Sequence, residues 1–185
     1  MVDFELYGGK QGYLKHLNAT ALFRFGAYHE ATDINWEKIS RLVFACKGNI
    51  CRSPYASART RFLGVPTDSF GFAAKVGSLA NPDAIRNAKL RGIDLNEHRS
   101  ADLDTCGIRE GDLLVVFEPP QIMEARRRGI RKAQITLLGI WGELPRPHIH
   151  DPYGHSDRYF QWCFSLIDSA VARLAAKVNA RLEEC

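Results

Sequence analysis

The residues whose types and spacing could do chemistry lie in one short segment, 46–54. It follows an apolar run at 42–45, which predicts a buried strand, and the proline at its end is suited to begin a helix. Gly48 and Asn49 adopt backbone conformations that other residues resist, so the loop can turn several N–H groups inward beside the helix N-terminus. The guanidinium of Arg52 adds a planar fork that matches phosphate oxygens. Together these features predict a cradle for a phosphate-sized anion.

Cys46 would lie at the base of that cradle. A free cysteine thiol is only about 3 % ionised at neutral pH, and a helix N-terminus with an adjacent arginine favours the thiolate. We therefore expect Cys46 to be a nucleophile beneath a bound phosphate, with Ser53 donating to the sulfur when it leaves. The alternatives are a structural cysteine in a tight turn and a metal site formed with Cys51. A metal site is disfavoured because no second Cys or His pair has suitable spacing and Arg52 would repel the ion.

The composition is that of an ordinary globular protein. The chain has 185 residues, of which 45 % are hydrophobic and 25 % are charged, which excludes disordered and fibrous classes. The net charge of +4 is too small to indicate nucleic-acid binding, and no apolar stretch approaches the length of a membrane span. The number of cysteines is odd, and the apolar core of a signal peptide is missing. These features indicate a reducing, cytoplasmic setting.

Apolar runs typical of buried strands alternate with segments typical of helices from residue 41 onward. This alternation predicts an α/β fold: a three-layer, doubly wound sheet of about four parallel strands flanked by helices, with the phosphate-binding loop after the first strand. Ligands bind at the carboxyl ends of the strands in such sheets. The expected strands are 42–45, 67–70, 113–117 and 133–138, and the expected helices are 54–63, 82–91, 119–129 and 160–182.

The first forty residues differ from the rest and predict an N-terminal helical extension, 1–40, before the main domain, 41–185. We expect a loop over 7–12 and a helix over 13–29. Asp33 is suited to cap a second short helix. Both helices would pack on the surface of the domain.

The segment Cys46-Lys-Gly-Asn-Ile-Cys-Arg-Ser-Pro54 resembles the phosphate-binding loop of the low-molecular-weight protein tyrosine phosphatases. The resemblance extends over about residues 41–182 and leaves out the first forty. It implies hydrolysis of phosphotyrosine monoesters through a phosphocysteine intermediate, without a metal or other cofactor. Further segments that match in order are Asp68-Ser69, Gly92–Leu95, His98–Ser100, Leu113–Glu118 and Asp151–Tyr153.

The resemblance also implies roles for individual residues. Cys46 is the implied nucleophile, Arg52 holds the phosphoryl oxygens together with the loop amides, and Asp151 is the implied general acid and later the base that activates water. A turn-forming Asp-Pro on the surface is the ordinary alternative for Asp151. The other implied residues of the phosphate-binding loop are Lys47, Gly48, Asn49, Ile50, Cys51 and Ser53.

Residues outside the loop complete the implied site. Asn49, Ser69 and His98 are similar to a network that fixes the loop conformation, with an ordinary part-exposed histidine as the alternative for His98. Tyr153 would line the pocket and stack on an aryl phosphate. Glu118 matches an acidic position near the site, and its role is left open.

Cys51 is the implied redox partner of Cys46, because a reversible disulfide between them would protect or silence the nucleophile. Lys47 departs from the family, in which this position is usually apolar. A second rim aromatic of the family falls in an ambiguous stretch, where either Phe72 or Lys75 takes its place. A more basic rim would favour acidic phosphopeptides.

Two other function classes are alternatives. A thiol-dependent arsenate reductase shares the fold and the nucleophile loop but needs further cysteines, and Cys106 is followed only by the distant Cys163. A phosphate-loop binding module acting through the N-terminal extension is the other. The basic run at 126–128 ends a predicted helix, which favours a solvated surface. The resemblance implies that the partner is a phosphotyrosine protein, with a bacterial tyrosine kinase as one candidate. We expect binding to neither nucleic acid nor membrane.

Overall fold

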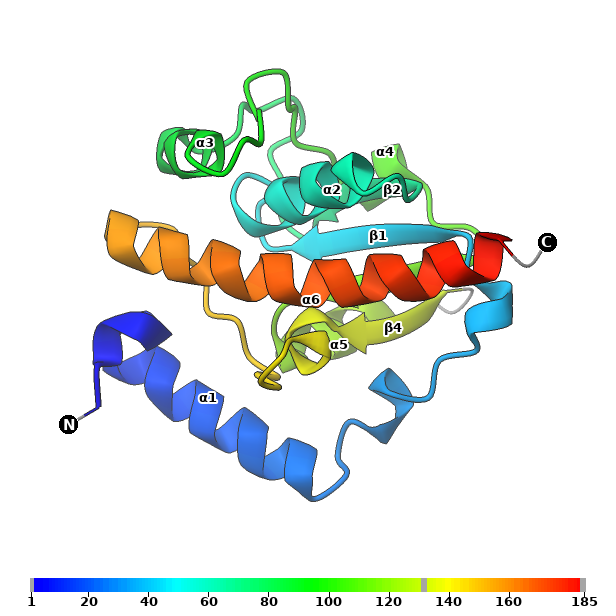
Figure 1. Ribbon diagram of the computed structural model, residues 1–185, viewed down its shortest axis with the longest axis horizontal. Coiled ribbons are helices and arrows are strands. Elements are labelled where there is room, and N and C mark those ends of the chain that lie inside the picture. Colours follow the sequence, from blue (N-terminus) through cyan, green and yellow to red (C-terminus); the bar gives the residue numbers. More distant parts are fainter. Residues whose placement is uncertain (1, 131–132, 184–185) are drawn as a thin grey trace.

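The computed structural model describes residues 2–130 and 133–183 of the chain. Its centre is a parallel four-stranded sheet with the strand order β2-β1-β3-β4 (Figure 1). Each strand coincides with a segment that the sequence marks as a strand, so the predicted α/β sheet is confirmed. The strands are β1 (Arg41–Cys46), β2 (Thr67–Gly71), β3 (Asp112–Val116) and β4 (Gln134–Leu137).

Helices occupy the connections between these strands. The short α4 is not predicted because four residues are too few for a periodic pattern, and its start is capped by Asp102, which accepts from the backbone N–H of Thr105. Within the described ranges, 2–130 and 133–183, no helix combines the length and the apolar character needed to cross a membrane. The helices are α2 (Arg52–Phe62), α3 (Pro82–Lys89), α4 (Leu103–Cys106), α5 (Pro119–Arg127) and α6 (Asp157–Glu183).

The sheet is covered on both faces, which makes the three layers. Alternate residues of a strand point to opposite faces, and in β1 Leu42 and Phe44 join one core while Val43 and Ala45 join the other. The first core is closed by α2 and α6, which runs across the front of Figure 1. The rings of Tyr55 on α2 and Phe164 on α6 stack there with centroids 3.7 Å apart.

The strand order explains why the predicted phosphate-binding loop lies after β1. The chain leaves β1 to one side to form β2 and returns on the other side to form β3. A crevice forms at such a switch point, at the carboxyl end of the strand where the order reverses. At the opposite end, Arg41 donates two hydrogen bonds of 2.7 Å to the buried carboxylate of Asp112 and fixes the register of β1 against β3. The loop after Cys46 is therefore anchored to a rigid strand.

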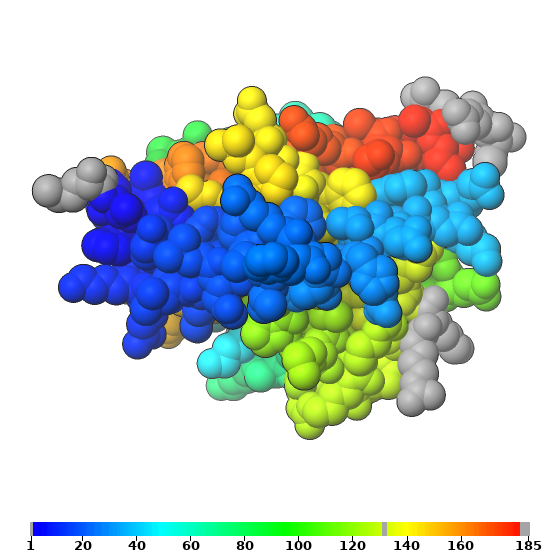
Figure 2. Space-filling view, turned by 90° about the horizontal axis from the view of Figure 1, so that it is seen from below, coloured from blue at the N-terminus to red at the C-terminus, as the bar shows by residue number. Residues whose placement is uncertain are grey.

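The N-terminal segment differs from its predicted bounds. A 3-10 turn, η1 (Phe4–Tyr7), leads through Gly8 into α1 (Gly9–Arg24), so the predicted loop over 7–12 and the helix start at 13 are wrong. Gly8 has a φ of +72°, a left-handed conformation that lets the chain turn directly from η1 into α1. Figure 2 shows this segment spread over one face of the molecule.

The second predicted helix of the extension is also wrong. Instead of a helix capped by Asp33, the chain forms only the short 3-10 turns η2 (His29–Ala31) and η3 (Trp36–Lys38), the latter preceded by Asn35. The reason is burial: Ile34 and Ile39 enter the core beneath α6, which an extended chain reaches more readily than a surface helix. The extension therefore shares its core with the sheet.

Candidate active site

The loop from Cys46 to Arg52 connects β1 to α2 and forms a closed turn. Cys46 ends β1 and is 3 % exposed. Asn49 has a φ of +54°, a left-handed conformation that asparagine tolerates better than most residues. Ser53, in the first turn of α2, lies with its Oγ 3.0 Å from Cys46 Sγ. The sulfur thus lies at the carboxyl end of the central strand, beside the N-terminus of a helix.

The side chain of Asn49 is the centre of a buried hydrogen-bond network. Its Nδ2 donates to Ser53 Oγ and Ser69 Oγ, both at 2.9 Å, and its Oδ1 accepts from the backbone N–H of Ala101 at 2.8 Å. His98 Nε2 donates to the Asn49 carbonyl oxygen at 2.8 Å. The structure therefore places Ser69 and His98 around the loop, where the resemblance implied them.

The network also orients the hydroxyl of Ser53. An amide nitrogen can only donate, so Ser53 Oγ accepts from Asn49 and must direct its own proton elsewhere. Cys46 Sγ at 3.0 Å is a closer acceptor than the Phe70 carbonyl oxygen at 3.5 Å. The Ser53 hydroxyl is thus placed to donate to the sulfur and to stabilise a thiolate there.

Arg52 is fully buried and joins three parts of the chain. Its Nη1 donates to Glu118 Oε1 at 2.6 Å, just after β3, and to the Ile149 carbonyl oxygen at 2.9 Å. Its Nη2 lies 2.9 Å from Asp151 Oδ2. Its Nε has no hydrogen-bond partner in the described part of the chain. A buried arginine with unused donors beside a nucleophile is suited to hold an anion.

Arg52 and the neighbouring carboxylates stabilise each other in their charged forms. Burial opposes the charge on Arg52, but the neighbouring carboxylates of Asp151 and Glu118 outweigh it and raise the pKa of the guanidinium. Burial likewise disfavours the carboxylate of Glu118, but Arg52 holds the pKa of Glu118 below its ordinary value. Both groups are therefore ionised at neutral pH, and the role of Glu118, left open by the sequence, is to pair with Arg52.

A pocket of about 220 Å³ opens above the loop. It brings together the phosphate-binding loop, the predicted acid Asp151 and the predicted aromatic Tyr153, which is 62 % exposed. A larger cavity of about 640 Å³ lies between α1 and α5 and reaches Glu118 but not the loop. The small pocket is lined by Cys46, Lys47, Gly48, Ile50, Cys51, Ala73, Asp151 and Tyr153.

The structure corrects the prediction that Phe72 lies at the rim. Phe72 is buried, with its ring edge-on to Phe70 at 5.3 Å between centroids and beneath the guanidinium of Arg128. The chain turns just after β2, so the next residue, Ala73, lines the pocket instead, and Lys75 is exposed. Sequence reasoning missed Ala73, and the only signal for it is its place directly after Phe72.

Cys51, Cys106 and Cys163 are free thiols that are buried or half-buried. Burial raises the pKa of the Cys51 thiol, which lines the same pocket, so Cys51 is a neutral thiol near pH 7. Burial also raises the pKa of both Cys106 and Cys163 to about 12. Over residues 2–130 and 133–183, no group of three or more His, Cys, Asp or Glu side chains is arranged to hold a metal ion.

The close approach of Gly71 to the phosphate-binding loop gives a test of the loop conformation. A Cβ added at Gly71 would lie 2.8 Å from the backbone of Lys47, Gly48 and Asn49, too close for the loop to keep its conformation. We predict that Gly71→Ala lowers kcat/KM for p-nitrophenyl phosphate at least about 100-fold, since a displacement of about 1 Å in a catalytic site has that effect. Steady-state kinetics and circular dichroism would measure activity and folding separately.

Gly142→Ala is the matched control, because nothing lies within 3.5 Å of its added Cβ. It should keep the parent activity. A folded Gly71→Ala variant with unchanged kinetics would show that the loop does not need this close approach.

Comparison with known proteins agrees with the geometry. The family model described as low molecular weight phosphotyrosine protein phosphatase matches residues 41–184. The probable low molecular weight protein-tyrosine-phosphatase EpsP of Ralstonia nicotianae is 31 % identical over 144 residues, which cover 77 % of this chain and 98 % of that protein.

Two solved structures are also similar. The tyrosine phosphatase Wzb from Escherichia coli K30 in complex with sulphate has 30 % identity and a TM-score of 0.65, with 76 % of this chain and 99 % of that one covered. The YwlE arginine phosphatase from Geobacillus stearothermophilus has 26 % identity and a TM-score of 0.67, with 78 % and 96 % covered. The chain therefore belongs to the low molecular weight phosphotyrosine protein phosphatase family and is similar to proteins named as protein-tyrosine-phosphatases.

Proposed function

We propose that this protein hydrolyses phosphotyrosine in proteins through a phosphocysteine intermediate on Cys46. The observation that carries the proposal is that Cys46 and Asp151 line one pocket of about 220 Å³, with the buried Arg52 Nη2 2.9 Å from Asp151 Oδ2. The three residues come from β1, α2 and the segment before α6, and their side chains supply a nucleophile, an anion-binding cation and a proton donor. Each is the residue type that phosphate-ester cleavage requires at its position.

Substrate binding uses the donors that the fold leaves unused. Arg52 Nη1 is held by Glu118 and Ile149, which fixes the plane of the guanidinium. Its Nε and Nη2 then face the phosphoryl oxygens, together with the inward N–H groups of the loop. Because the phosphate dianion takes over Nη2, the carboxyl of Asp151 is released to act on the leaving group.

The reaction follows in two balanced steps. In the first, Cys46 Sγ attacks phosphorus, the bond to the phenolic oxygen breaks, and Asp151 gives that oxygen its proton. In the second, Asp151 takes a proton from water, the water oxygen attacks phosphorus, and the S–P bond breaks. Ser53 donates a hydrogen bond to the departing thiolate from 3.0 Å. The products are the phenol, inorganic phosphate and the regenerated thiolate.

The walls of the pocket support an aryl phosphate as the substrate. Ile50, Ala73 and the exposed ring of Tyr153 form apolar walls that suit a flat phenyl ring. Within the described chain, Asp151 is the one carboxylate that lines the pocket, and it is committed to proton transfer. A phosphorylated guanidinium would need further acceptors for its N–H groups, so phosphotyrosine fits better than phosphoarginine.

The surroundings of the pocket support a protein substrate with acidic flanking residues. Lys47 is exposed at the rim and would attract them. A bacterial tyrosine kinase is a partner of this kind, and a cytoplasmic location would bring the two together. We assign catalysis to the domain at 41–185. We regard 1–40 as an extension of this domain, since Ile34 and Ile39 share the core of the sheet.

Substitution of the two reacting groups tests the mechanism. We predict that Cys46→Ser lowers kcat by about 10⁴-fold or more, because the nucleophile is lost, and that Asp151→Asn lowers it by about 10²–10⁴-fold, because the group that donates the proton and then activates water is lost. Hydrolysis of p-nitrophenyl phosphate measures both. Cys106→Ser, outside the pocket, is the control and should retain the parent rate. Full activity of Cys46→Ser would refute the phosphocysteine mechanism.

The choice of phosphoamino acid gives a second test. We predict that a phosphotyrosine peptide is hydrolysed with a kcat/KM at least about 100-fold above that of a phosphoarginine peptide of the same sequence, because an apolar slot leaves guanidinium N–H groups unpaired. Phosphate release from the two peptides measures the ratio. A ratio below one would overturn the assignment of phosphotyrosine.

Cys51 gives a third test. We propose that peroxide converts Cys46 to a sulfenic acid and that the Cys51 thiol then displaces water to form a disulfide. Parent enzyme treated with peroxide should then regain most of its activity in dithiothreitol. Cys51→Ser should regain at least about fivefold less, because its sulfenic acid proceeds to the irreversible sulfinic acid. Equal recovery of the two proteins would contradict a protective role for Cys51.

A further inference from the structure

The segment that carries Asp151 has little regular structure of its own. It runs from the end of the 3-10 turn η4 (Leu138–Trp141) to the start of α6 and contains neither helix nor strand. Inside the catalytic domain Ile149 N–H donates to Phe117 O at 2.9 Å, Tyr159 Oη donates to His150 O at 3.1 Å, and Arg52 contacts Ile149 O and Asp151. Further contacts to this segment, 142–156, come from outside the catalytic domain.

These contacts come from residues 3–12 of the N-terminal extension, which pack against it. Gly8 and Gly12 lie so close to His150, the neighbour of Asp151 in the chain, that the imidazole rests on their backbone. A Cβ added at Gly8 would collide with His150 Cδ2. Burial lowers the pKa of His150, so a neutral ring occupies this contact at neutral pH.

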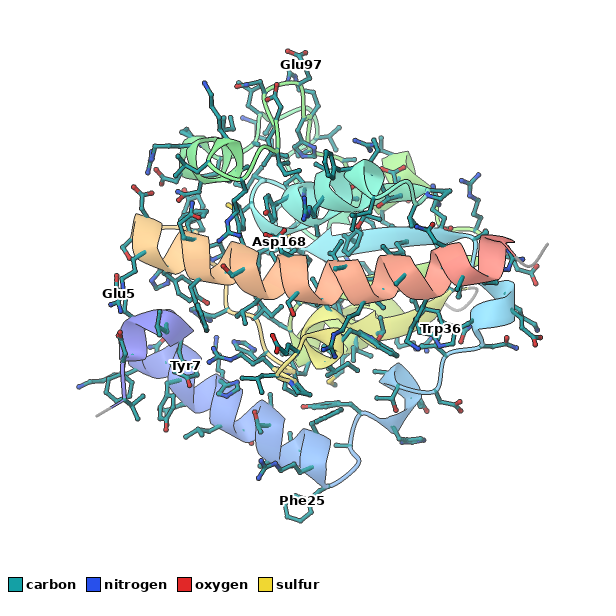
Figure 3. The ribbon with its side chains drawn as sticks, in the orientation of Figure 1. Glu5, Tyr7, Phe25, Trp36, Glu97 and Asp168 are labelled. Atoms are coloured by element: carbon teal, nitrogen blue, oxygen red, sulfur yellow. The ribbon has the colours of Figure 1, made fainter. Side chains whose placement is uncertain are left out.

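A second contact follows the acid along the chain. Arg158, in the first turn of α6, lies 2.6 Å from both Asp3 Oδ2 and Glu5 Oε2. Ser156 Oγ donates to Glu5 Oε1. Figure 3 shows Glu5 beside the start of α6. Each exposed ion pair is weak alone, but here two carboxylates share one guanidinium, and the carboxylate of Glu5 also accepts from the Ser156 hydroxyl.

A third contact precedes the acid. The guanidinium of Arg146 lies 4.6 Å from the ring centroid of Tyr7 and 5.3 Å from that of Trp162. Its Nη1 donates to Leu6 O at 3.4 Å. A guanidinium over an aromatic ring is attracted by the negative face of the ring. The N-terminal segment thus contacts the Asp151 segment before, beside and after the acid.

We propose that residues 3–12 are a clamp that positions Asp151 for proton transfer, an inference that rests on the proposed function. The clamp residues touch neither the pocket nor the phosphate-binding loop, so they act through the Asp151 segment. Proton donation requires hydrogen-bond reach of the leaving oxygen, and small displacements lower the rate steeply. The role is that of a positioning segment, and it lies outside the part of the chain that the family model matches.

Leaving-group dependence separates this role from simple structural support. Phenolate is a poorer leaving group than p-nitrophenolate and depends more on the proton from Asp151. We expect Gly8→Ala to lower kcat/KM for phenyl phosphate about tenfold and that for p-nitrophenyl phosphate less than about threefold. Gly9→Ala is the matched control, since Gly9 also has a positive φ, +86°, but nothing within 4 Å of an added Cβ.

A second comparison tests whether the effect passes through Asp151. In the Asp151→Asn background, Gly8→Ala should cause no further loss with phenyl phosphate, because the two changes act on the same proton transfer. If Gly8→Ala does not fold, the double variant Glu5→Gln/Arg158→Gln replaces it under the same criteria, because it removes the ionic contact without a steric clash.

The clamp is overturned if Gly8→Ala and Gly9→Ala behave alike, if both substrates lose activity equally, or if the loss persists in the Asp151→Asn background. Asp151→Asn alone separates the two proposals. If it lowers activity on phenyl phosphate while Gly8→Ala does not, the clamp fails and the proposed function stands. If Asp151→Asn itself leaves phenyl phosphate hydrolysis unchanged, the general-acid mechanism fails.

Discussion

The buried guanidinium of Arg52 is the interaction on which the site depends. Removing a cation from water costs several kcal/mol in a real protein interior, so it must be matched by nearby carboxylates and hydrogen-bond acceptors. Glu118 and the Ile149 carbonyl hold one end of it, and Asp151 lies at the other. These partners follow β3 and precede α6, so one side chain joins the phosphate-binding loop to both of these segments.

Two histidines near this cluster are uncharged at neutral pH, so they add no positive charge to it. Burial lowers the pKa of His148 to about 4, despite the nearby Glu118, so His148 carries no charge at neutral pH. Burial also lowers the pKa of His98, whose neutral ring donates to Asn49 O. In the proposed mechanism the anion is therefore held by Arg52, the loop amides and the N-terminal end of α2, with the imidazoles as neutral packing and hydrogen-bonding groups.

The sequence predicts local features well and tertiary ones poorly. The spacing of Cys46 and Arg52 between an apolar run and a proline predicts the loop, because these residues all lie within nine positions of one another. The pairing of Glu118 with Arg52 could not be derived, since it depends on β3 lying beside β1. Phe72 was misplaced because the turn after β2 shifts the rim by one residue. Gly8 and Gly12 suggest a loop, whereas in the structure both pack closely against His150, a tertiary contact that the sequence does not reveal.

In the proposed mechanism, Cys46 carries the phosphoryl group during turnover. Rapid-quench mass spectrometry of the Asp151→Asn variant with p-nitrophenyl phosphate tests it most directly, because loss of the base slows hydrolysis of the intermediate. The account predicts a phosphoryl adduct on Cys46, approaching one per molecule, and none in a Cys46→Ser/Asp151→Asn double variant. An adduct on another residue would contradict a phosphocysteine intermediate. So would a variant that releases p-nitrophenol in a burst and continues to turn over but carries no adduct.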